Sequence, residues 1–271
     1  MRRIGVLGCG AMGSLISRAI DEGTIAKAKL TALYDVISEK CLKLSRELGR
    51  VKPRVCRSFE EFLDAGVDLV VETASQEAVR NYAPEVVSNG VDLMILSVGA
   101  LLDPELEGKL EDLARRTGAK IYVPSGAIAG VDGIAAASIL GVERIRHVIR
   151  KAPGSFGAEV LRRFGIPPRL KEPRVIYRGK AEEAVKLFPA NVNVVATLRL
   201  CSRAPVEVEV VVDPEVSGNV HEITVESRAS RIHVKMENLR HPENPRTSLI
   251  AALSAVRMLK RICDAGLIIG T

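Results

Sequence analysis

Short apolar segments alternate with longer segments of helical periodicity over residues 1–123. The longer segments carry apolar residues three and four positions apart, which predicts helices with one buried stripe. Two of these helices have marked starts, because Ser58 precedes Glu61 at capping-box spacing and Asp103 directly precedes Pro104. The short segments predict strands at 3–7, 30–35, 53–56, 68–73, 92–97 and 120–123. This alternation is typical of an α/β fold with a doubly wound parallel sheet.

The pattern changes after Pro124, where strands no longer alternate with helices one by one. Helices are expected near both ends of this part, at 127–140 and 247–263. The strands expected between them are 145–151, 205–213, 218–227 and 230–237. The last three are rich in Val, Ile and Glu and are separated by turn residues, so we expect an antiparallel meander with one face in solvent.

These patterns divide the chain into three parts. We expect a doubly wound domain over 1–123 and an α+β domain with a mainly antiparallel sheet over 124–245. Residues 246–271 are expected to form a C-terminal helix that packs back on the first domain. A chain of 271 residues, 47% of them hydrophobic, is long enough to bury cores of this size.

Composition excludes several classes of protein. No apolar run approaches the roughly 18 residues that a membrane span requires, so no membrane partner is expected. The five cysteines lack C-x-x-C spacing, which argues against a zinc site and a disulfide framework and favours a reducing cytoplasm. We expect no metal. Gln76 is the only glutamine while charged residues are plentiful, a composition typical of thermophilic sources.

The formal net charge of +6 does not indicate a nucleic-acid partner. Lysines and arginines are interleaved with acids, and the chain has five Phe, four Tyr and no Trp with which to stack bases. An excess of cations also suits a small anionic substrate and a pyrophosphate.

A glycine-rich turn lies between the first strand and the first helix. It reads Gly8, Cys9, Gly10, Ala11, Met12, Gly13, and Asp35 ends the second strand about 20 residues later. In such a turn the first glycine permits the tight bend, the second admits a pyrophosphate and the third lets the helix pack on its strand. A carboxylate at this distance hydrogen-bonds an adenosine ribose. The sequence therefore predicts a Rossmann-type site for a nicotinamide dinucleotide.

Residues after two other strands are expected to border the same cofactor. Ligands of open α/β sheets bind beyond the carboxyl ends of the strands. Ordinary turn chemistry is the alternative role for each of these positions. The residues are Thr73, Ala74, Ser97, Val98 and Gly99.

One of the four histidines stands out. His221 shares a strand face with Ile223 and Val225, so its imidazole lies on the expected apolar side of the sheet. A core histidine and a catalytic base are the two interpretations. We expect His233 to be solvated, His241 to lie in a proline-flanked loop and His147 to have no role beyond its strand.

Two other groups are candidates for binding. Asn191 and Asn193 lie at the start of an expected helix, where helix capping competes with contacts to the nicotinamide or the substrate. Cations and hydroxyls that follow a strand or begin a helix could hold carboxylates, with surface charge and capping as the alternatives. These are Arg150, Lys151, Arg246, Thr247 and Ser248.

Taken in order, seven segments resemble the L-aspartate dehydrogenase family over essentially the whole chain. They are GCGAMG at 8–13, SVGAL at 97–101, PSGAIAGVDGI at 124–134, RKAP at 150–153, FPANVNV at 188–194, GNVHEI at 218–223 and NPRTS at 244–248. The resemblance implies oxidation of L-aspartate by NAD(P)⁺ to iminoaspartate, which yields oxaloacetate and ammonia or feeds NAD biosynthesis. It implies a substrate and catalytic domain over 124–245.

The resemblance also implies roles for individual residues. His221 corresponds to the active-site histidine of the family, and Ser125, Gly126, Ala127 and Asn191 correspond to its cofactor contacts. The family uses NAD and often NADP. Asp35 is not followed by an arginine, which favours NAD here. We expect a homo-oligomer, most simply a dimer.

Two alternatives remain open at this point. A homoserine dehydrogenase or a dihydrodipicolinate reductase-like enzyme would share the architecture, but GNVHEI argues against both. A regulator that senses NAD(H) without turning it over is compatible with the charge, although neither end shows a helix-turn-helix or a basic arm.

Overall fold

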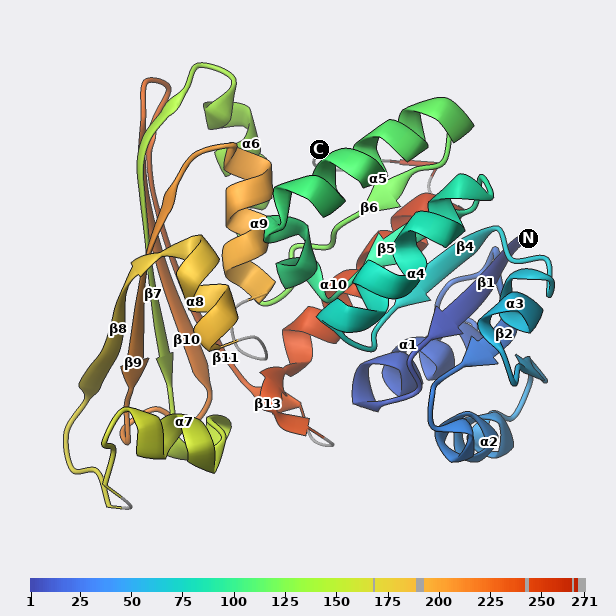
Figure 1. Cartoon of the computed structure of the whole chain (residues 1–271), viewed down its shortest axis with the longest axis horizontal. Helices are drawn as coiled ribbons and strands as arrows, with labels where there is room; N and C mark the ends of the chain where they lie inside the picture. The colour runs from blue at the N-terminus through green and yellow to red at the C-terminus, as the bar shows by residue number, and fades with distance from the viewer. Residues whose placement is uncertain (168, 189–192, 242–243, 265, 268–271) are drawn as a thin grey trace. The chain divides into compact units, whose positions relative to one another are not determined.

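The protein, seen in a computed structural model, consists of two compact units (Figure 1). The first unit comprises Met1–Pro124 and the described residues from Ala252 onward, and the second comprises Ser125–Ala251. The structure describes residues 1–167, 169–188, 193–241, 244–264 and 266–267.

The first unit is built on a six-stranded sheet in which every pairing is parallel. The strand order is β3-β2-β1-β4-β5-β6, so the chain moves outward from β1 first in one direction and then in the other. The strands are β1 Arg2–Leu7, β2 Ala28–Tyr34, β3 Arg54–Val55, β4 Leu69–Glu72, β5 Asp92–Ile95 and β6 Ile121–Tyr122. This order confirms the doubly wound, Rossmann-type sheet.

Helices connect these strands. Ser58 accepts a hydrogen bond from the Glu61 N–H at 3.1 Å, and Asp103 caps the helix that begins at Pro104, which confirms both capping signals. The helices are α1 Ala11–Asp21, α2 Ser38–Glu47, α3 Phe59–Leu63, α4 Gln76–Ser88, η1 Val98–Leu102 and α5 Pro104–Thr117.

The C-terminal helix α10 (Leu249–Asp264) contributes to the core of the first unit. Its Ala255, Val256 and Leu259 lie in one buried cluster with side chains of β1, β2, β4, α1 and α2. Asp264 accepts hydrogen bonds from the backbone N–H groups of Ala26 and Lys27, at 3.0 and 2.7 Å. The three domains expected from the sequence, 1–123, 124–245 and 246–271, remain a prediction.

The second unit is built on a five-stranded mixed sheet with the order β11-β10-β7-β9-β8. The strands are β7 Val142–Lys151, β8 Arg174–Lys180, β9 Val206–Val212, β10 Asn219–Ser227 and β11 Arg231–Asn238. A small separate sheet contains β12 Arg240–His241 and β13 Asn244–Ser248.

The expected meander of 205–213, 218–227 and 230–237 is wrong in its pairing. Only β10 and β11 form a hairpin, because β7 lies between β9 and β10 and runs parallel to β9. The chain between β7 and β9 passes through helices and β8 before it returns, which is the crossover that parallel pairing requires.

Helices α6 and α9 lie side by side against one face of this sheet (Figure 1). The expected helix 127–140 is shorter than predicted, because Gly126 and Gly130 have φ of +67° and +78° and keep the chain out of the helix until Val131. Likewise Thr247 and Ser248 end strand β13 and do not begin the last helix. The helices are α6 Val131–Ser138, η2 Pro153–Ser155, α7 Ala158–Arg163, α8 Ala181–Leu187 and α9 Asn193–Ser202.

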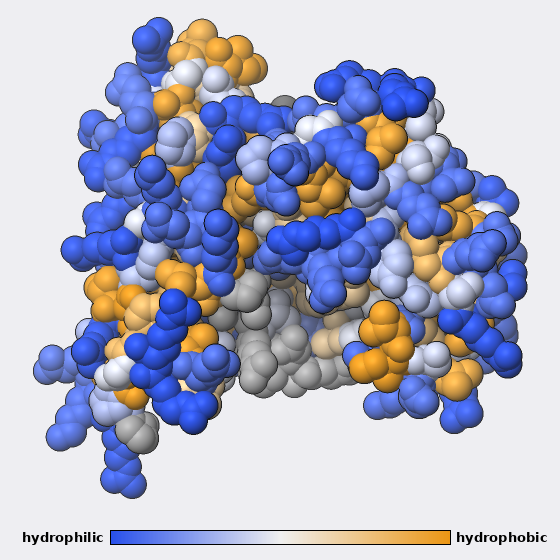
Figure 2. Space-filling model, viewed as in Figure 1, coloured by the Kyte–Doolittle hydropathy of each residue, from blue (hydrophilic) through white to orange (hydrophobic). Residues whose placement is uncertain are grey.

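The surface agrees with the charged composition. The face seen in Figure 2 is mostly hydrophilic, with smaller separate hydrophobic areas. Among the described residues, no helix combines the length and the apolar character needed to cross a bilayer.

Candidate active site

The glycine-rich turn occupies the carboxyl end of β1 in the first unit. Gly8 has a φ of +97°, and a Cβ there would press on Ala74. A Cβ on Gly13 would overlap the carbonyl oxygen of Gly8, so the helix α1 can approach its strand only without a side chain. Gly10 differs, because a Cβ there would meet open space. That space beside the first turn of α1 fits a pyrophosphate.

Asp35 lies at the end of β2 and is buried. Its carboxylate accepts hydrogen bonds from the backbone N–H groups of Cys9 at 2.8 Å and Ile37 at 2.9 Å. Asp35 therefore shapes the turn as well as offering oxygen atoms to a ribose. Lys40 of α2 brings its Nζ to 3.9 Å from the same carboxylate. Sequence reasoning missed this cation.

Cys9 lies inside the turn, with its thiol buried against that of Cys41. Its Sγ is 3.3 Å from the Sγ of Cys41, and both side chains are buried. The hydrogen bond with Cys41, followed by burial, raises the pKa of the Cys9 thiol. Both side chains belong to the buried cluster of the first unit.

Glu72, at the end of β4, holds together the two loops that were expected to border the cofactor. Its buried carboxylate accepts hydrogen bonds from the N–H groups of Ala74 (2.7 Å), Ser75 (3.0 Å) and Ser97 (3.0 Å) and from the Ser97 hydroxyl (2.9 Å). Burial raises the pKa of Glu72, and these four donors oppose that rise. A carboxyl residue at a buried strand end was the available signal, and the sequence analysis passed over it.

Thr73 joins the end of β4 to the turn that follows β1. Its hydroxyl donates to the Gly8 carbonyl oxygen at 2.6 Å, so it fixes the loop after β4 to the glycine-rich turn. The structure thus brings together most of the expected cofactor residues of the first unit. These are residues 8–13, Asp35, Thr73, Ala74 and Ser97, with Val98 and Gly99 buried behind them in η1.

The second unit contains a pair of buried histidines on the face of the sheet that carries α6 and α9. His221 of β10 is 2% exposed and His147 of β7 is fully buried. Nε2 of His147 lies 3.0 Å from Nδ1 of His221, and the two rings are tilted by 32°. His147 lies in strand β7 as expected, and its ring also contacts the candidate base directly.

Both imidazoles are neutral near neutral pH. Burial, followed by the positive charge of Lys151, lowers the pKa of His147 to about 3. Burial, then His147 and Lys151, lowers the pKa of His221 well below its usual range. A neutral imidazole has a ring nitrogen free to accept a proton, while the lowered pKa makes this nitrogen a weaker base than that of a free imidazole.

Lys151 lies on the same face, four residues along β7 from His147, and is only 4% exposed. It is paired in register with Asn219 of β10, whose Nδ2 donates to the Ser248 hydroxyl at 2.9 Å. Oδ1 of Asn219 has no hydrogen-bond partner among the described residues. Burial lowers the pKa of Lys151 to about 8. These groups offer a cation, an amide and a hydroxyl beside His221, which suits a carboxylate.

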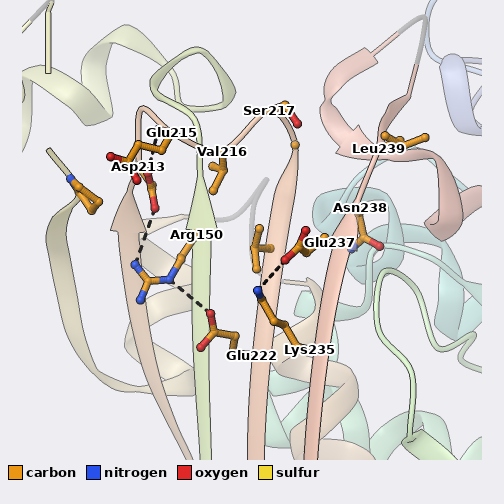
Figure 3. Close-up of a pocket in the computed structure, with 13 residues that line it drawn as sticks. Arg150, Asp213, Glu215, Val216, Ser217, Glu222, Lys235, Glu237, Asn238 and Leu239 are labelled. Atoms are coloured by element: carbon orange, nitrogen blue, oxygen red, sulfur yellow. Dashed lines mark hydrogen bonds and ion pairs between the residues drawn. The ribbon is translucent and has the colours of Figure 1, made fainter. Parts of the chain in front are cut away.

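Arg150, a neighbour in sequence, does not belong to this group. Successive strand residues point to opposite faces, and Arg150 lies on the outer face, 3.7 Å from Asp213 and 3.5 Å from Glu222. It lines a pocket of about 520 Å³ that also contains the Lys235–Glu237 pair (Figure 3). Its charge is balanced by these acids, so the expectation that Arg150 holds a substrate carboxylate is not supported.

The other expected site residues are placed as follows. Gly126 is in the left-handed region, and the Ala127 carbonyl oxygen accepts a hydrogen bond from Asn238 at 2.8 Å, which anchors the segment containing Ser125. Asn193 begins α9. Arg246 and Thr247 belong to β13, next to Ser248. Asn191 lies outside the described residues.

His233 and His241 complete the histidines. His233 is exposed and hydrogen-bonds Thr224, as a solvated strand residue should. His241 is buried in β12 and does not lie in a loop, which corrects the expectation for that residue.

In comparisons with known protein families, each half of the chain matches a dehydrogenase family model. The family model "Aspartate dehydrogenase, C-terminal" matches residues 132–262, and "Homoserine dehydrogenase, NAD binding domain" matches residues 8–124. The second match covers only the nucleotide-binding half, which different dehydrogenases share. The first covers the half with the histidine pair.

Full-length relatives agree with the first match. L-aspartate dehydrogenases from Methanosarcina acetivorans and Methanocaldococcus jannaschii are 46% and 40% identical to this chain, each over 97% of it and 98% of the relative. The crystal structure of aspartate dehydrogenase from Thermotoga maritima is similar with a TM-score of 0.76 at 27% identity, covering 100% of both chains. The resemblance seen in the sequence is confirmed, and the chain belongs to the L-aspartate dehydrogenase family.

Proposed function

We propose that this protein oxidises L-aspartate with NAD⁺, and with NADP⁺ less efficiently, to iminoaspartate. The observation that carries the proposal is the buried group of His221, His147, Lys151 and Asn219 on one sheet face, in a chain whose other unit has a dinucleotide turn. A dicarboxylate with an amino group needs a base and carboxylate partners, and this group offers both.

The roles follow from the chemistry of the reaction. The substrate ammonium must lose a proton before its Cα can lose a hydride, and Nε2 of His221 is the atom that accepts this proton. Lys151, a buried cation on the same face as His221, pairs with a substrate carboxylate. The nicotinamide, when bound, supplies the hydride acceptor. The loops tied by Glu72 and Thr73 would hold that cofactor.

A steady-state assay tests the proposal. We expect NADH formation with L-aspartate and none with homoserine or other amino acids, at pH values from neutral to alkaline. Homoserine-dependent reduction would favour the homoserine dehydrogenase alternative. NADH binding without turnover of any amino acid would favour the regulator.

Asp35→Ala is expected to lower the ratio of kcat/KM for NAD over NADP by roughly tenfold or more, because a ribose hydroxyl loses its acceptor. Lys40, 3.9 Å from that carboxylate, would then be available to a 2′-phosphate. The double variant Asp35→Ala, Lys40→Ala should therefore lose the gain for NADP. Both ratios are measured with L-aspartate saturating, and melting temperature checks the turn. An unchanged ratio in Asp35→Ala would remove the assigned role.

Lys151→Met is expected to raise KM for L-aspartate by about tenfold or more while stabilising the fold at pH 7. Burial lowers the folded-state pKa to about 8 from an ordinary 10.5, so the unfolded chain binds a proton that the folded chain does not between these values. The buried charge of Lys151 therefore destabilises the folded state fully below pH 8 and no longer does so above pH 10.5. The stability gain of the variant should therefore fade as pH rises through this window.

Melting temperatures from pH 7 to 10.5 check the second part of this prediction, with Lys109→Met on the exposed face of α5 as the control. We expect a gain of roughly 3 °C at pH 7 for Lys151→Met and none for the control. An unchanged KM would show that the substrate carboxylates are held elsewhere.

The setting of the reaction is also part of the proposal. We infer a cytoplasmic homodimer from the family resemblance and from cysteines that are all free among the described residues. Size-exclusion chromatography with light scattering tests the dimer. Iminoaspartate that leaves before hydrolysis would feed NAD biosynthesis, and trapping by a partner enzyme during turnover distinguishes release from hydrolysis on the protein.

A further inference from the structure

The 3.0 Å contact between the two histidine rings is a single hydrogen bond, and either ring can be its donor. With both rings neutral, either His221 donates from Nδ1 or His147 donates from Nε2. Once His221 has taken a proton, both of its ring nitrogens are donors. Only one arrangement then remains, in which His221 donates from Nδ1 to Nε2 of a neutral His147.

We propose that His147 is a positioning residue that accepts a hydrogen bond from the protonated form of His221 and thereby supports proton uptake at Nε2 of His221. This inference rests on the proposed function. His147 touches neither substrate nor cofactor in this assignment and acts only through His221.

The side chains around the pair offer Nδ1 of His221 no other strong hydrogen-bond acceptor on the sheet. His147 faces Val208 across the parallel pairing with β9 and Ile223 across the antiparallel pairing with β10, and His221 faces Ile149 and Met236. The aliphatic neighbours cannot accept a hydrogen bond and the Met236 thioether is only a weak acceptor, so His147 is the strong acceptor that the sheet offers to Nδ1 of His221. A charge-assisted hydrogen bond in so apolar a site is stronger than one in water.

Charged groups near the pair come from few elements. Lys151, on the same strand as His147, disfavours a positive charge on either ring. A charge on His147 would also lower the pKa of His221, but a neutral His147 carries no such charge and can only accept the hydrogen bond. The helices that cover this face carry Asp132, which is exposed, and Arg199, which is partly buried. A second positive charge so close to Lys151 needs a neutral acceptor beside it, and the low pKa of His147 keeps that ring neutral.

The other ring nitrogen of His147 lowers the stability of the fold. Its Nδ1 is buried and has no hydrogen-bond partner among the described residues. Natural proteins rarely leave such an atom unpaired unless the residue has a task, because it costs free energy without return. A leucine at this position would avoid this cost, so a leucine variant separates a packing role from a positioning role.

The test compares His147→Leu with His147→Gln in the holoenzyme turning over L-aspartate and NAD⁺. The leucine removes the acceptor and keeps the volume, and the glutamine can place its Oε1 near the position of Nε2. We expect His147→Leu to lower kcat by roughly tenfold or more and to shift the acidic limb of the kcat profile to lower pH by about one unit. His147→Gln should restore much of kcat and return the limb toward its wild-type position.

A structural role alone would give a different result. His147→Leu should keep or raise the melting temperature, because it removes an unpaired buried polar atom, so any loss of kcat is not loss of fold. His233→Leu, which removes an exposed imidazole from β11, is the control for kcat. A leucine variant with wild-type kcat and an unmoved acidic limb would overturn the proposal.

A second measurement needs no substrate and no variant. Nitrogen-15 spectra of the histidine rings report protonation and tautomer, and we expect His147 to stay neutral from pH 5 to 8. Titration of His147 in this range would overturn the proposal. Absence of aspartate turnover in the wild-type protein would instead defeat the proposed function, and the ring spectra would still show which histidine accepts.

Discussion

His221→Ala is expected to lower turnover of L-aspartate by on the order of 10²-fold or more, because removal of a general base typically costs this much. The variant loses the only imidazole nitrogen that our assignment places against the substrate ammonium. It leaves the dinucleotide turn in the first unit untouched, so the Kd for NADH should change little. Stopped-flow or steady-state NADH formation measures turnover, and fluorescence titration measures binding.

The loss should depend on pH in a defined way. Without the imidazole, proton removal from the substrate falls to solvent, so the residual rate should rise with pH toward the pKa of the free amine instead of levelling off. His233→Ala, which removes an exposed imidazole from the same sheet, should behave like the wild-type protein. Unchanged turnover in His221→Ala would make His221 a core histidine, the alternative that the alternating pattern left open.

Periodicity predicted the first unit well because its signals are local. Each strand of the parallel sheet is a short apolar run, and each following helix has its own capping or turn residue, as at Ser58 and Asp103. The strand order then follows from the right-handed crossovers that such units impose. Prediction of the Rossmann-type fold needed no knowledge of distant contacts.

The second unit could not be predicted in the same way. Alternation assigned the strands near β9, β10 and β11 but could not show that β7, far upstream, separates β9 from β10. Strand pairing between distant segments depends on which crossover packs best, and no local pattern encodes that choice.

The alternating pattern could have placed His147 on the buried face of the sheet, but it could not have predicted the contact with His221. In β7, His147 alternates with Ile145 and Ile149, so it shares their buried face, whereas Arg146 belongs to the other face. The same rule assigns Lys151 to the buried face and Arg150 to the outer one. Strict use of the two-residue period would have brought His147 and Lys151 to the face of His221, though not to within hydrogen-bonding distance.

Gly13→Ala is expected to destabilise the first unit by roughly 3 kcal/mol and to abolish NAD binding. The new methyl group would overlap the Gly8 carbonyl oxygen, which is backbone and accepts the Thr73 hydroxyl at 2.6 Å. The gain in helix propensity, about 1 kcal/mol for alanine over glycine, cannot offset a displaced strand end. Urea denaturation followed by fluorescence or circular dichroism measures the free energy of unfolding.

Gly10→Ala is the matched control within the same turn. Its Cβ would meet no atom within 4 Å, so the free energy of unfolding should change by less than about 1 kcal/mol, which is the scale of an N-cap change. The methyl group would nevertheless occupy the space beside the first turn of α1, so NAD affinity should fall as it does in Gly13→Ala. The two variants therefore share a binding defect and differ in stability. If Gly10→Ala bound NAD like the wild-type protein, the pyrophosphate would not lie against this turn, and the resemblance of the first unit to nicotinamide enzymes would be one of fold alone.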